Sequence, residues 1–279
     1  MKKISYLLLL LAIISCSSET ETLNIMTYNI RYDNPNDGEN QWINRKEYLC
    51  DQIKYNEIDI FGIQEGLHHQ VQFLDENFLD FSYVGIGRDD GKEKGEYSAI
   101  FYNSKKFKVI ESNTFWLSET PTKISVGWDA SMERICTYAL FESIKKKEHF
   151  LVFNTHFDHI GVLARLESSK LIYSKIEEVN TSNLPVFVMG DFNLLPESEP
   201  IKYLSKKLDD SKEISVLKPF GPTGTFNGFK FHKPVKDRID YIFTNKEKVQ
   251  IHKFAILSDS KNCKYPSDHL PVVIEVEFK

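Results

Sequence analysis

The sequence predicts an α/β fold in which two mostly antiparallel β-sheets pack face to face and carry helices on their outer sides. Segments with strand character outnumber segments with helical spacing, and helices are expected between only some of the strands. Polar residues also gather where apolar strand segments end. Strand ends at one edge of a sandwich bring distant residues into one cleft, so the same pattern predicts a functional site there.

The first part of the chain is predicted to alternate strands with helices. Leu23–Ile30 alternates in polarity and is rich in residues that favour strands. Leu49 and Ile53 are spaced as on one face of a helix. The predicted elements are a strand at Leu23–Ile30, a helix at Glu47–Asn56, a strand at Asp59–Gln64 and a helix at His68–Asn77.

The middle of the chain is predicted to be mostly strands, followed by a long helix. The five strands are expected at Tyr83–Gly87, Ser98–Tyr102, Lys108–Trp116, Ile135–Glu142 and Phe150–Thr155. Apolar residues then recur with the period of a helix at Leu163, Leu166, Ile172 and Ile176. This spacing predicts a helix over Ile160–Val179.

The C-terminal part is again predicted to be rich in strands. Val186–Met189 is a short apolar segment that fits a buried strand, and Glu197–Leu208 is predicted as a helix. Four more strands are expected at Thr225–Phe229, Arg238–Thr244, Val249–Leu257 and Pro271–Phe278. We therefore expect residues 23–279 to form the globular domain.

Residues 1–22 have the pattern of a lipoprotein signal peptide and tether. Lys2 and Lys3 precede the apolar segment Tyr6–Ile14, which is too short to span a bilayer and is typical of a signal peptide. Ile13, Ile14 and Ser15 lead into Cys16, as in a bacterial lipobox. We expect export, lipidation of Cys16 and anchoring to a membrane on the periplasmic side or at the cell surface. The alternative is an ordinary cleaved signal peptide with an incidental cysteine.

Composition and charge narrow the function classes. The formal charge of the whole chain is −5, whereas proteins that bind nucleic acid tightly usually carry a basic excess. Besides Cys16 the chain has Cys50, Cys136 and Cys263, an odd number at wide spacing without a CxxC motif. This pattern favours buried, unreactive thiols over a disulfide framework or a zinc site.

Eight polar residues at predicted strand ends match the needs of a phosphoester hydrolase. Taken singly, each has a structural explanation as a turn former, a helix cap or a core histidine. Together they supply oxygen ligands for Mg²⁺, a carboxylate to activate water, and amide or imidazole donors for phosphoryl oxygens. These residues are Asn29, Glu65, His156, Asp191, Asn193, Asp240, Asp268 and His269.

Six short motifs in order along the chain resemble the endonuclease/exonuclease/phosphatase superfamily, which is deoxyribonuclease I-like. They are TYNIR at 27–31, IQE at 63–65, NTH at 154–156, GDFN at 190–193, RIDY at 238–241 and SDHLPV at 267–272. The resemblance covers nearly all of the chain after the signal segment. It implies a four-layer α/β sandwich and a single in-line displacement by water without a covalent intermediate.

The resemblance also implies roles for the metal-binding and water-activating residues. Glu65 is implied as the principal metal ligand, assisted by Asn29, and Asp268 as a neighbour of the metal. Asp191 is implied to position or deprotonate the attacking water, and Asn193 to orient the phosphate. Such oxygen ligands suit Mg²⁺, and Mn²⁺ is also possible.

Two histidine–carboxylate pairs are implied in the same way. His269 is expected to contact the phosphate or act as a base, oriented by Asp240. His156 is expected to be a second phosphate donor, paired with Glu96. Each carboxylate is expected to raise the pKa of its histidine by opposite-charge attraction.

Three more residues are assigned to substrate binding. Arg31 and Arg134 are candidates for phosphate contacts, although an ion-paired arginine is the commoner case. Asp158 follows the His156 strand and either contacts substrate or caps the helix that follows.

The leading function is an Mg²⁺-dependent phosphodiesterase or phosphomonoesterase outside the cytoplasm. Its partner is a phosphate-ester substrate, which could be a small molecule, a lipid headgroup or a nucleic acid, and the protein is expected to act as a monomer. A secreted endonuclease for DNA or RNA is the alternative. A non-catalytic binding module is a third possibility, disfavoured by the complete set of acidic and histidine residues.

Overall fold

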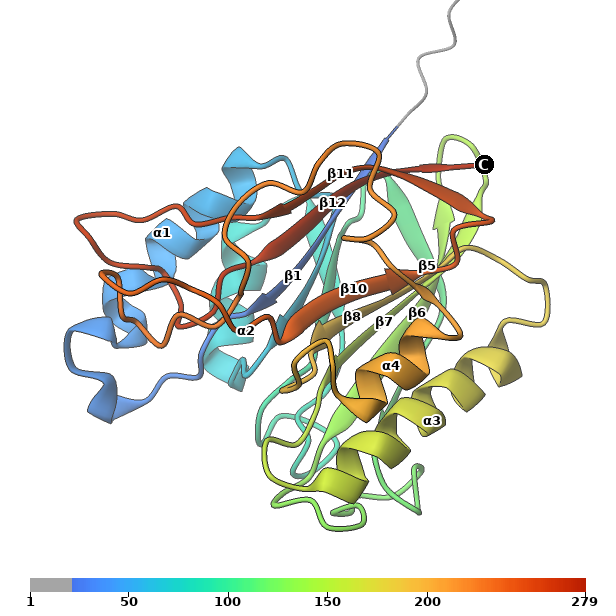
Figure 1. Ribbon diagram of the computed structural model, residues 1–279, viewed down its shortest axis with the longest axis horizontal. Coiled ribbons are helices and arrows are strands. Elements are labelled where there is room, and N and C mark those ends of the chain that lie inside the picture. The colour runs from blue at the N-terminus through green and yellow to red at the C-terminus, as the bar shows by residue number, and fades with distance from the viewer. Residues whose placement is uncertain (1–21) are drawn as a thin grey trace, which may run out of the picture.

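A computed structural model describes residues 22–279, and these residues form two six-stranded sheets that pack face to face (Figure 1). The first sheet has the order β11-β12-β1-β2-β4-β3 and the second the order β5-β6-β7-β8-β10-β9. The strands of the first sheet are β1 (Leu23–Asn29), β2 (Ile60–Gln64), β3 (Phe81–Val84), β4 (Ile100–Asn103), β11 (Val249–Ile256) and β12 (Val272–Phe278). Those of the second are β5 (Phe107–Trp116), β6 (Ile135–Ser143), β7 (His149–His156), β8 (Val186–Asp191), β9 (Asp209–Asp210) and β10 (Asp240–Thr244).

Helices cover the outer side of each sheet, which confirms the predicted four-layer sandwich. Two helices, α1 (Trp42–Tyr55) and α2 (His68–Asn77), pack on the first sheet, and α3 (Val162–Val179) and α4 (Glu199–Ser205) pack on the second (Figure 1). A 3-10 helix, η1 (Pro35–Asn40), precedes α1. None of the helices among residues 22–279 is long and apolar enough to cross a membrane.

Three apolar clusters hold the layers together, and strand alternation divides residues between them. In β1, Ile25 points between the sheets whereas Met26 and Tyr28 point toward α1 and α2. In β8, Phe187 and Met189 point between the sheets while Val186 and Val188 face α3 and α4. Both faces of the central strands are therefore buried, which explains their nearly continuous apolar sequences.

Each sheet contains one central parallel pair, and these two pairs position the cleft. β1 runs parallel to β2, and β7 runs parallel to β8, because α1 and α3 form the crossover connections. The carboxyl ends of parallel strands lie at the same edge. Asn29 is thus opposite Gln64 in one sheet, and His156 is opposite Asp191 in the other.

Buried polar side chains fasten the two parallel pairs to each other just below that edge. Gln64 donates to the side-chain oxygens of Asn154 at 2.6 Å and Thr27 at 3.1 Å. Asn154 in turn donates to the backbone carbonyls of Ile63 and Ala99, both at 2.9 Å. Gly62 makes room for this contact, because a Cβ there would lie 2.7 Å from the Asn154 side chain.

The structure corrects several predicted elements. The predicted strand Thr225–Phe229 is wrong, because only Phe226 pairs there, with His269, and the chain then turns through positive φ at Gly228 and Phe229. α1 begins at Trp42, earlier than the predicted Glu47. β9 and η1 were not predicted.

The expectation of buried thiols is only partly right. Cys50 and Cys136 are buried, and burial raises the pKa of the Cys50 thiol to about 12. Cys263 is exposed, which corrects the prediction for that residue. All three cysteines are free thiols. The predicted lipidation site, Cys16, lies outside the described residues.

Candidate active site

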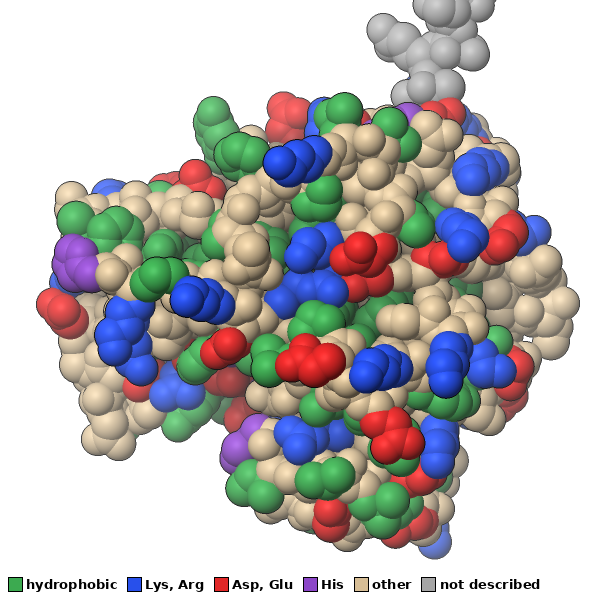
Figure 2. Space-filling model, in the orientation of Figure 1, with side chains coloured by type: hydrophobic (Ala, Val, Ile, Leu, Met, Phe, Trp, Pro, Cys, Tyr) green, Lys and Arg blue, Asp and Glu red, His purple; other side chains and the backbone are tan. Residues whose placement is uncertain are grey.

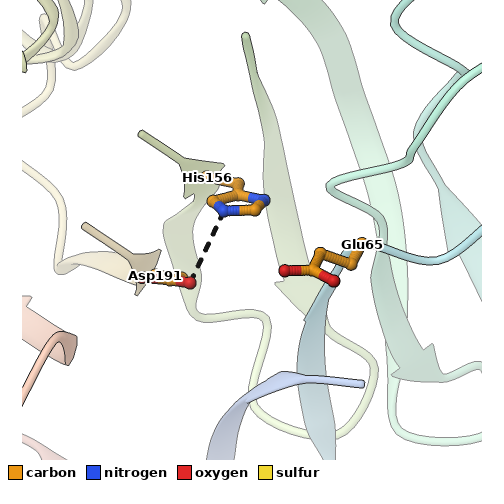
Figure 3. Close-up of side chains that lie close together, drawn as sticks. All are labelled: Glu65, His156 and Asp191. Atoms are coloured by element: carbon orange, nitrogen blue, oxygen red, sulfur yellow. Dashed lines mark ion pairs between the residues drawn. The ribbon is translucent and has the colours of Figure 1, made fainter. Parts of the chain in front are cut away.

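The ends of the two parallel strand pairs open into one cleft of about 530 Å³. Figure 3 shows the side chains of Glu65, His156 and Asp191 facing one another across it, with the 3.5 Å contact between His156 Nε2 and Asp191 Oδ2 marked. The cleft is lined by Arg31, Tyr32, Glu65, Arg88, Glu96, Met132, Arg134, His156, His159, Asp191, Asn193, Phe226, Ile239, Asp268 and His269. Most residues predicted from the sequence are therefore brought together, and the roles assigned to them stay predictions.

Asp191 lies at the centre of the site and is fully buried. Its Oδ2 accepts a hydrogen bond from Asn29 Nδ2 at 2.9 Å, and its Oδ1 accepts from the backbone N–H of Asn193 at 2.8 Å. Burial, and next the neighbouring Asp240 carboxylate, raise the pKa of Asp191 to about 7. A carboxyl group with this pKa can accept a proton near neutral pH.

His269 and Asp240 form the predicted pair. The Nδ1 of His269 lies 2.9 Å from Asp240 Oδ2, and both side chains are buried. Burial alone would lower the pKa of His269, but Asp240 and Asp191 together raise it well above its usual value. The imidazolium form is favoured, and its Nε2 lies 3.7 Å from Asp191 Oδ2.

His156 does not have the environment that was predicted. Its Nδ1 is 3.7 Å from Glu96 Oε2, beyond hydrogen-bond distance, and Glu96 is held instead by Arg88 through two hydrogen bonds of 2.7 and 3.0 Å. Burial, and then the guanidinium groups of Arg134 and Arg88, lower the pKa of His156 well below its usual value. The predicted approach of Glu96 to His156 is present at 3.7 Å, whereas the predicted rise in the pKa of His156 is contradicted.

The amide of Asn193 fixes the tautomer of His156. Asn193 Nδ2 donates to the backbone carbonyl of Phe157 at 3.0 Å, which sets the orientation of the amide. The same nitrogen lies 3.1 Å from His156 Nε2, so that ring nitrogen must accept. The proton of the neutral ring is then on Nδ1, which has no hydrogen-bond partner within residues 22–279.

Glu65 and Asp268 form the acidic wall of the cleft. Arg31 lies between them, 3.8 Å from Glu65 Oε2 and 3.8 Å from Asp268 Oδ2. Arg31 is also bonded to both oxygens of Asp37 at 3.0 Å, so much of its charge is already paired. It lines the cleft as predicted, but as a counter-ion to acidic side chains.

The donor set fits a divalent metal ion. Ligand atoms of Glu65, His156 and Asp191 lie within 4.8 Å of one another. His156 Nε2 already accepts from Asn193, so the carboxylates of the cleft are the better candidates for ligands. Burial raises the pKa of Asp268, His269 opposes this rise and the neighbouring Glu65 carboxylate adds to it. Asn29 turns its amide nitrogen toward Glu65 Oε1 as well as Asp191, at 2.9 Å, so here it bridges two carboxylates. Its predicted role as a ligand is not tested by this geometry.

Asp158 is a structural residue and does not line the cleft. Its carboxylate accepts from the backbone N–H groups of Ile160 and Gly161, just before α3, and from the Ser131 hydroxyl at 2.7 Å. Burial opposes ionisation, but these donors hold the pKa of Asp158 well below its usual range. The helix-capping interpretation is therefore the better one, and the substrate-binding assignment of Asp158 is corrected.

Several residues of the cleft were not predicted from the sequence. They are Tyr32, Arg88, Met132, Phe226 and Ile239. Arg88 was detectable, because it follows the predicted strand Tyr83–Gly87 in the same way that the recognised polar residues follow theirs. Met132 and Ile239 carry no such signal, since apolar residues near strand ends are ordinary.

Comparisons with known proteins agree with this geometry. Residues 26–269 match the Endonuclease/Exonuclease/phosphatase family. An endonuclease/exonuclease/phosphatase family protein from Bacteroides thetaiotaomicron is 37% identical with a TM-score of 0.90, covering 94% of this chain and 99% of that one. A mannosyl-6-phosphatase from the same species is 38% identical with a TM-score of 0.88, covering 92% of this chain and 100% of that one.

A curated relative is more distant and longer. A probable RNA exonuclease from Saccharomyces cerevisiae is 29% identical over 218 residues, which are 70% of this chain but only 42% of that protein. The family match spans both parallel strand pairs and nearly every residue of the cleft. The chain therefore belongs to the endonuclease/exonuclease/phosphatase family, whose members hydrolyse phosphoester bonds.

Proposed function

We propose that this protein is an Mg²⁺-dependent phosphoesterase that acts on small phosphorylated molecules, phosphosugars above all, outside the cytoplasm. The observation that carries the proposal is the convergence on one cleft of buried carboxylates, a histidine bonded to a carboxylate and an oriented amide. The central members are Asp191, His269 and Asn193, with Glu65 and Asp268 on the acidic wall.

The chain's own residues supply the steps of hydrolysis. Asp191 orients a water molecule and takes its proton as the water oxygen bonds to phosphorus. The bond from phosphorus to the leaving alcohol oxygen breaks, and this oxygen takes a proton from solvent in the open cleft. His269, held by Asp240 at 2.9 Å, donates to the charge that gathers on the phosphoryl oxygens.

Glu65 and Asp268 would hold the metal ion, with Asn29 beside them. When bound, Mg²⁺ or Mn²⁺ would polarise a phosphoryl oxygen as a Lewis acid. Hard oxygen donors without a cysteine favour these ions over Zn²⁺.

The similarity to a mannosyl-6-phosphatase supports a phosphosugar as the substrate class, because it extends over the whole of that chain at 38% identity. A nuclease is the second candidate, supported by the RNA exonuclease relative. The charge of −5 weighs against tight binding of a polyanion. On the face drawn in Figure 2, basic and acidic side chains are interspersed and form no continuous basic stripe.

We propose further that the protein is exported and anchored through lipid on Cys16. The basis is the lipobox pattern alone, since residues 1–21 are not described. Cys16→Ser should release the protein from the membrane fraction or block its maturation, because acylation requires that sulfur. Unchanged membrane fractionation of this variant would refute the anchor.

A hydrolysis screen with Mg²⁺ tests the catalytic proposal. It compares mannose 6-phosphate, p-nitrophenyl phosphate, bis-p-nitrophenyl phosphate, phospholipid, RNA and plasmid DNA. Turnover of the phosphosugar should be the highest and should disappear after exhaustive EDTA treatment. Glu65→Gln should weaken Mg²⁺ binding, measured by calorimetry, while the melting temperature stays within a few degrees. Activity that survives EDTA contradicts metal dependence, and exclusive turnover of RNA or DNA contradicts the substrate class.

A further inference from the structure

The cleft also carries the two guanidinium groups of Arg88 and Arg134, of which that of Arg88 is paired with the carboxylate of Glu96. His159 lies beside Arg134. We propose that Arg134 is a specificity-determining residue that binds the third terminal oxygen of a phosphomonoester and thereby selects monoesters over diesters. This inference rests on the proposed function and identifies which ester class the site accepts.

Arg134 is buried and incompletely paired. Only 4% of the residue is exposed, although it lines the cleft. Its Nη2 donates to His159 Nδ1 at 3.0 Å, and its Nε lies 3.5 Å from Asp158 Oδ1. Its Nη1 has no hydrogen-bond partner within the described chain. The protein therefore compensates the guanidinium charge incompletely, and an anionic oxygen bound in the cleft that Arg134 lines would offset this cost.

The nearest carboxylate neutralises Arg134 poorly. Asp158 already accepts hydrogen bonds from Ser131, Ile160 and Gly161 at 2.7 to 3.2 Å, all shorter than its contact with Arg134. Positive charge therefore remains at this end of the cleft. The lowered pKa of the neighbouring His156 has burial as its first cause and Arg134 as its second, which agrees with a local cationic field.

Arg88 adds positive charge near Arg134, but most of its own donors are occupied by protein groups. Two of its nitrogens donate to Glu96, and its Nε makes no hydrogen bond within the described residues but lies 3.7 Å from Asp89 Oδ1. Arg88, Glu96, Arg134 and His156 also line a narrow space beneath the cleft, in which no volume remains for an ester group. This end of the cleft therefore holds two guanidinium groups, of which Arg88 is the better neutralised.

His159 provides a donor beside Arg134. Arginine has only donors, so the His159 nitrogen that faces Arg134 must accept. The proton of the neutral ring is then on Nε2, and the residue is exposed. A hydroxyl or phosphate oxygen of a substrate can meet it there.

Phosphomonoesters and phosphodiesters differ in charge and in the number of terminal oxygens, and Arg134 interacts with both features. A monoester near neutral pH carries between one and a half and two negative charges, because its second pKa is about 6. It also has three terminal oxygens, whereas a diester has two and a second ester arm. A terminal oxygen in the open cleft can approach Arg134 where that residue lines it, whereas the ester arm of a diester carries no charge to pair with the guanidinium group.

A purely structural role for Arg134 makes a different prediction. Arg134 contacts Asp158, which anchors the start of α3, so its loss could simply loosen that loop. In that case turnover of both ester classes and the melting temperature would fall together. Selection of monoesters requires instead that the two ester classes respond differently.

The experiment uses the holoenzyme with Mg²⁺ and the variants Arg134→Gln and Arg134→Lys, with Lys170→Gln on α3 as a charge-matched control. Kcat/KM is measured for p-nitrophenyl phosphate and bis-p-nitrophenyl phosphate, which share a leaving group. Arg134→Gln should lower the monoester value about 10²-fold. The diester value should change by less than about threefold, and Arg134→Lys should be intermediate for the monoester.

Ligand binding separates failure of this inference from failure of the proposed function. Calorimetry should show that inorganic phosphate binds roughly tenfold to a hundredfold more weakly to Arg134→Gln than to wild type. Dimethyl phosphate should bind both proteins alike. Equal losses for both ligands, or equal losses of both ester activities, overturn the role of Arg134. A wild type that binds phosphate in this Arg134-dependent way but turns over no ester contradicts only the proposed function.

Discussion

The two buried histidines of the cleft lie at nearly the same distance from Asp191 but in opposite electrostatic surroundings. The Nε2 of His156 is 3.5 Å from Asp191 Oδ2, and that of His269 is 3.7 Å away. The pKa of His269 is raised, because Asp240 and Asp191 outweigh the effect of burial. The pKa of His156 is lowered, because burial is reinforced by Arg134 and Arg88.

The difference shows that the charge of a histidine depends on the other contacts of its carboxylate. Asp240 gives one oxygen to His269, and its other oxygen has no partner within the described residues. Both carboxylate oxygens of Glu96 accept hydrogen bonds from Arg88, so little of the Glu96 charge acts on His156. One histidine is thus suited to stabilise negative charge, while the other accepts a hydrogen bond and orients Asn193.

The largest effect is expected from breaking the pair of His269 and Asp240. His269→Ala and Asp240→Asn should each lower kcat about 10³-fold, because each removes the cationic donor beside the phosphoryl group. The double variant should be little worse than either single variant, since the two residues act as a unit. Steady-state kinetics on the best substrate of the screen provides the measurement. Fully additive losses would mean that the two residues act separately.

A smaller effect is expected at the other histidine. His156→Ala should lower kcat roughly tenfold to a hundredfold through misplacement of Asn193, less than His269→Ala. Glu96→Gln should cost less than about tenfold, since Glu96 hydrogen-bonds to Arg88, whereas its contact with His156 Nδ1 is longer, at 3.7 Å. If Glu96→Gln were as damaging as Asp240→Asn, the two pairs would be equivalent and the comparison would fail.

Much of this site could be predicted from the sequence because parallel strands end at one edge. Asn29 and His156 end their strands, Glu65 directly follows one, and Asp191 ends another, so residues distant along the chain converge. The pairing of His269 with Asp240 was also predicted, and its 2.9 Å distance confirms the contact.

The charge of His156 could not be predicted, because it depends on which neighbour Glu96 contacts. Arg88 is close in sequence to Glu96, but nothing in the sequence indicates that it takes both carboxylate oxygens. The role of Asp158 was left open for a similar reason, since a residue before a helix can cap it or face a cleft. The strand predicted at Thr225–Phe229 failed because the turn at Gly228 and Phe229 competes with pairing.

The smallest effect is expected in how the free energy of unfolding of the metal-free protein depends on pH. His156 has a lowered pKa when folded, so stability falls as pH drops through the unfolded value near 6.5. His269 has a raised pKa when folded, so its contribution is complete below about 6.5 and is lost as pH rises through the folded value. His156→Gln should reduce the loss of unfolding free energy toward acid pH, and His269→Gln should reduce the loss toward alkaline pH. Each change should be on the order of 1 kcal/mol.

Urea unfolding between about pH 5.5 and 8.5 in EDTA measures both effects on the same scale. His149→Gln, at an exposed histidine on β7, serves as the control and should leave both losses unchanged. If both active-site variants reduced the loss of unfolding free energy in the same pH range, the two pKa values could not be shifted in opposite directions.

The protonation of the two rings can be observed directly by long-range ¹H–¹⁵N NMR of the side-chain nitrogens, assigned with His156→Gln and His269→Gln. At pH 7, His269 should show two protonated nitrogens, as an imidazolium does. His156 should show one protonated nitrogen, Nδ1, and an unprotonated Nε2 that accepts from Asn193. Two rings with the same protonation state and the same titration curve would contradict the account.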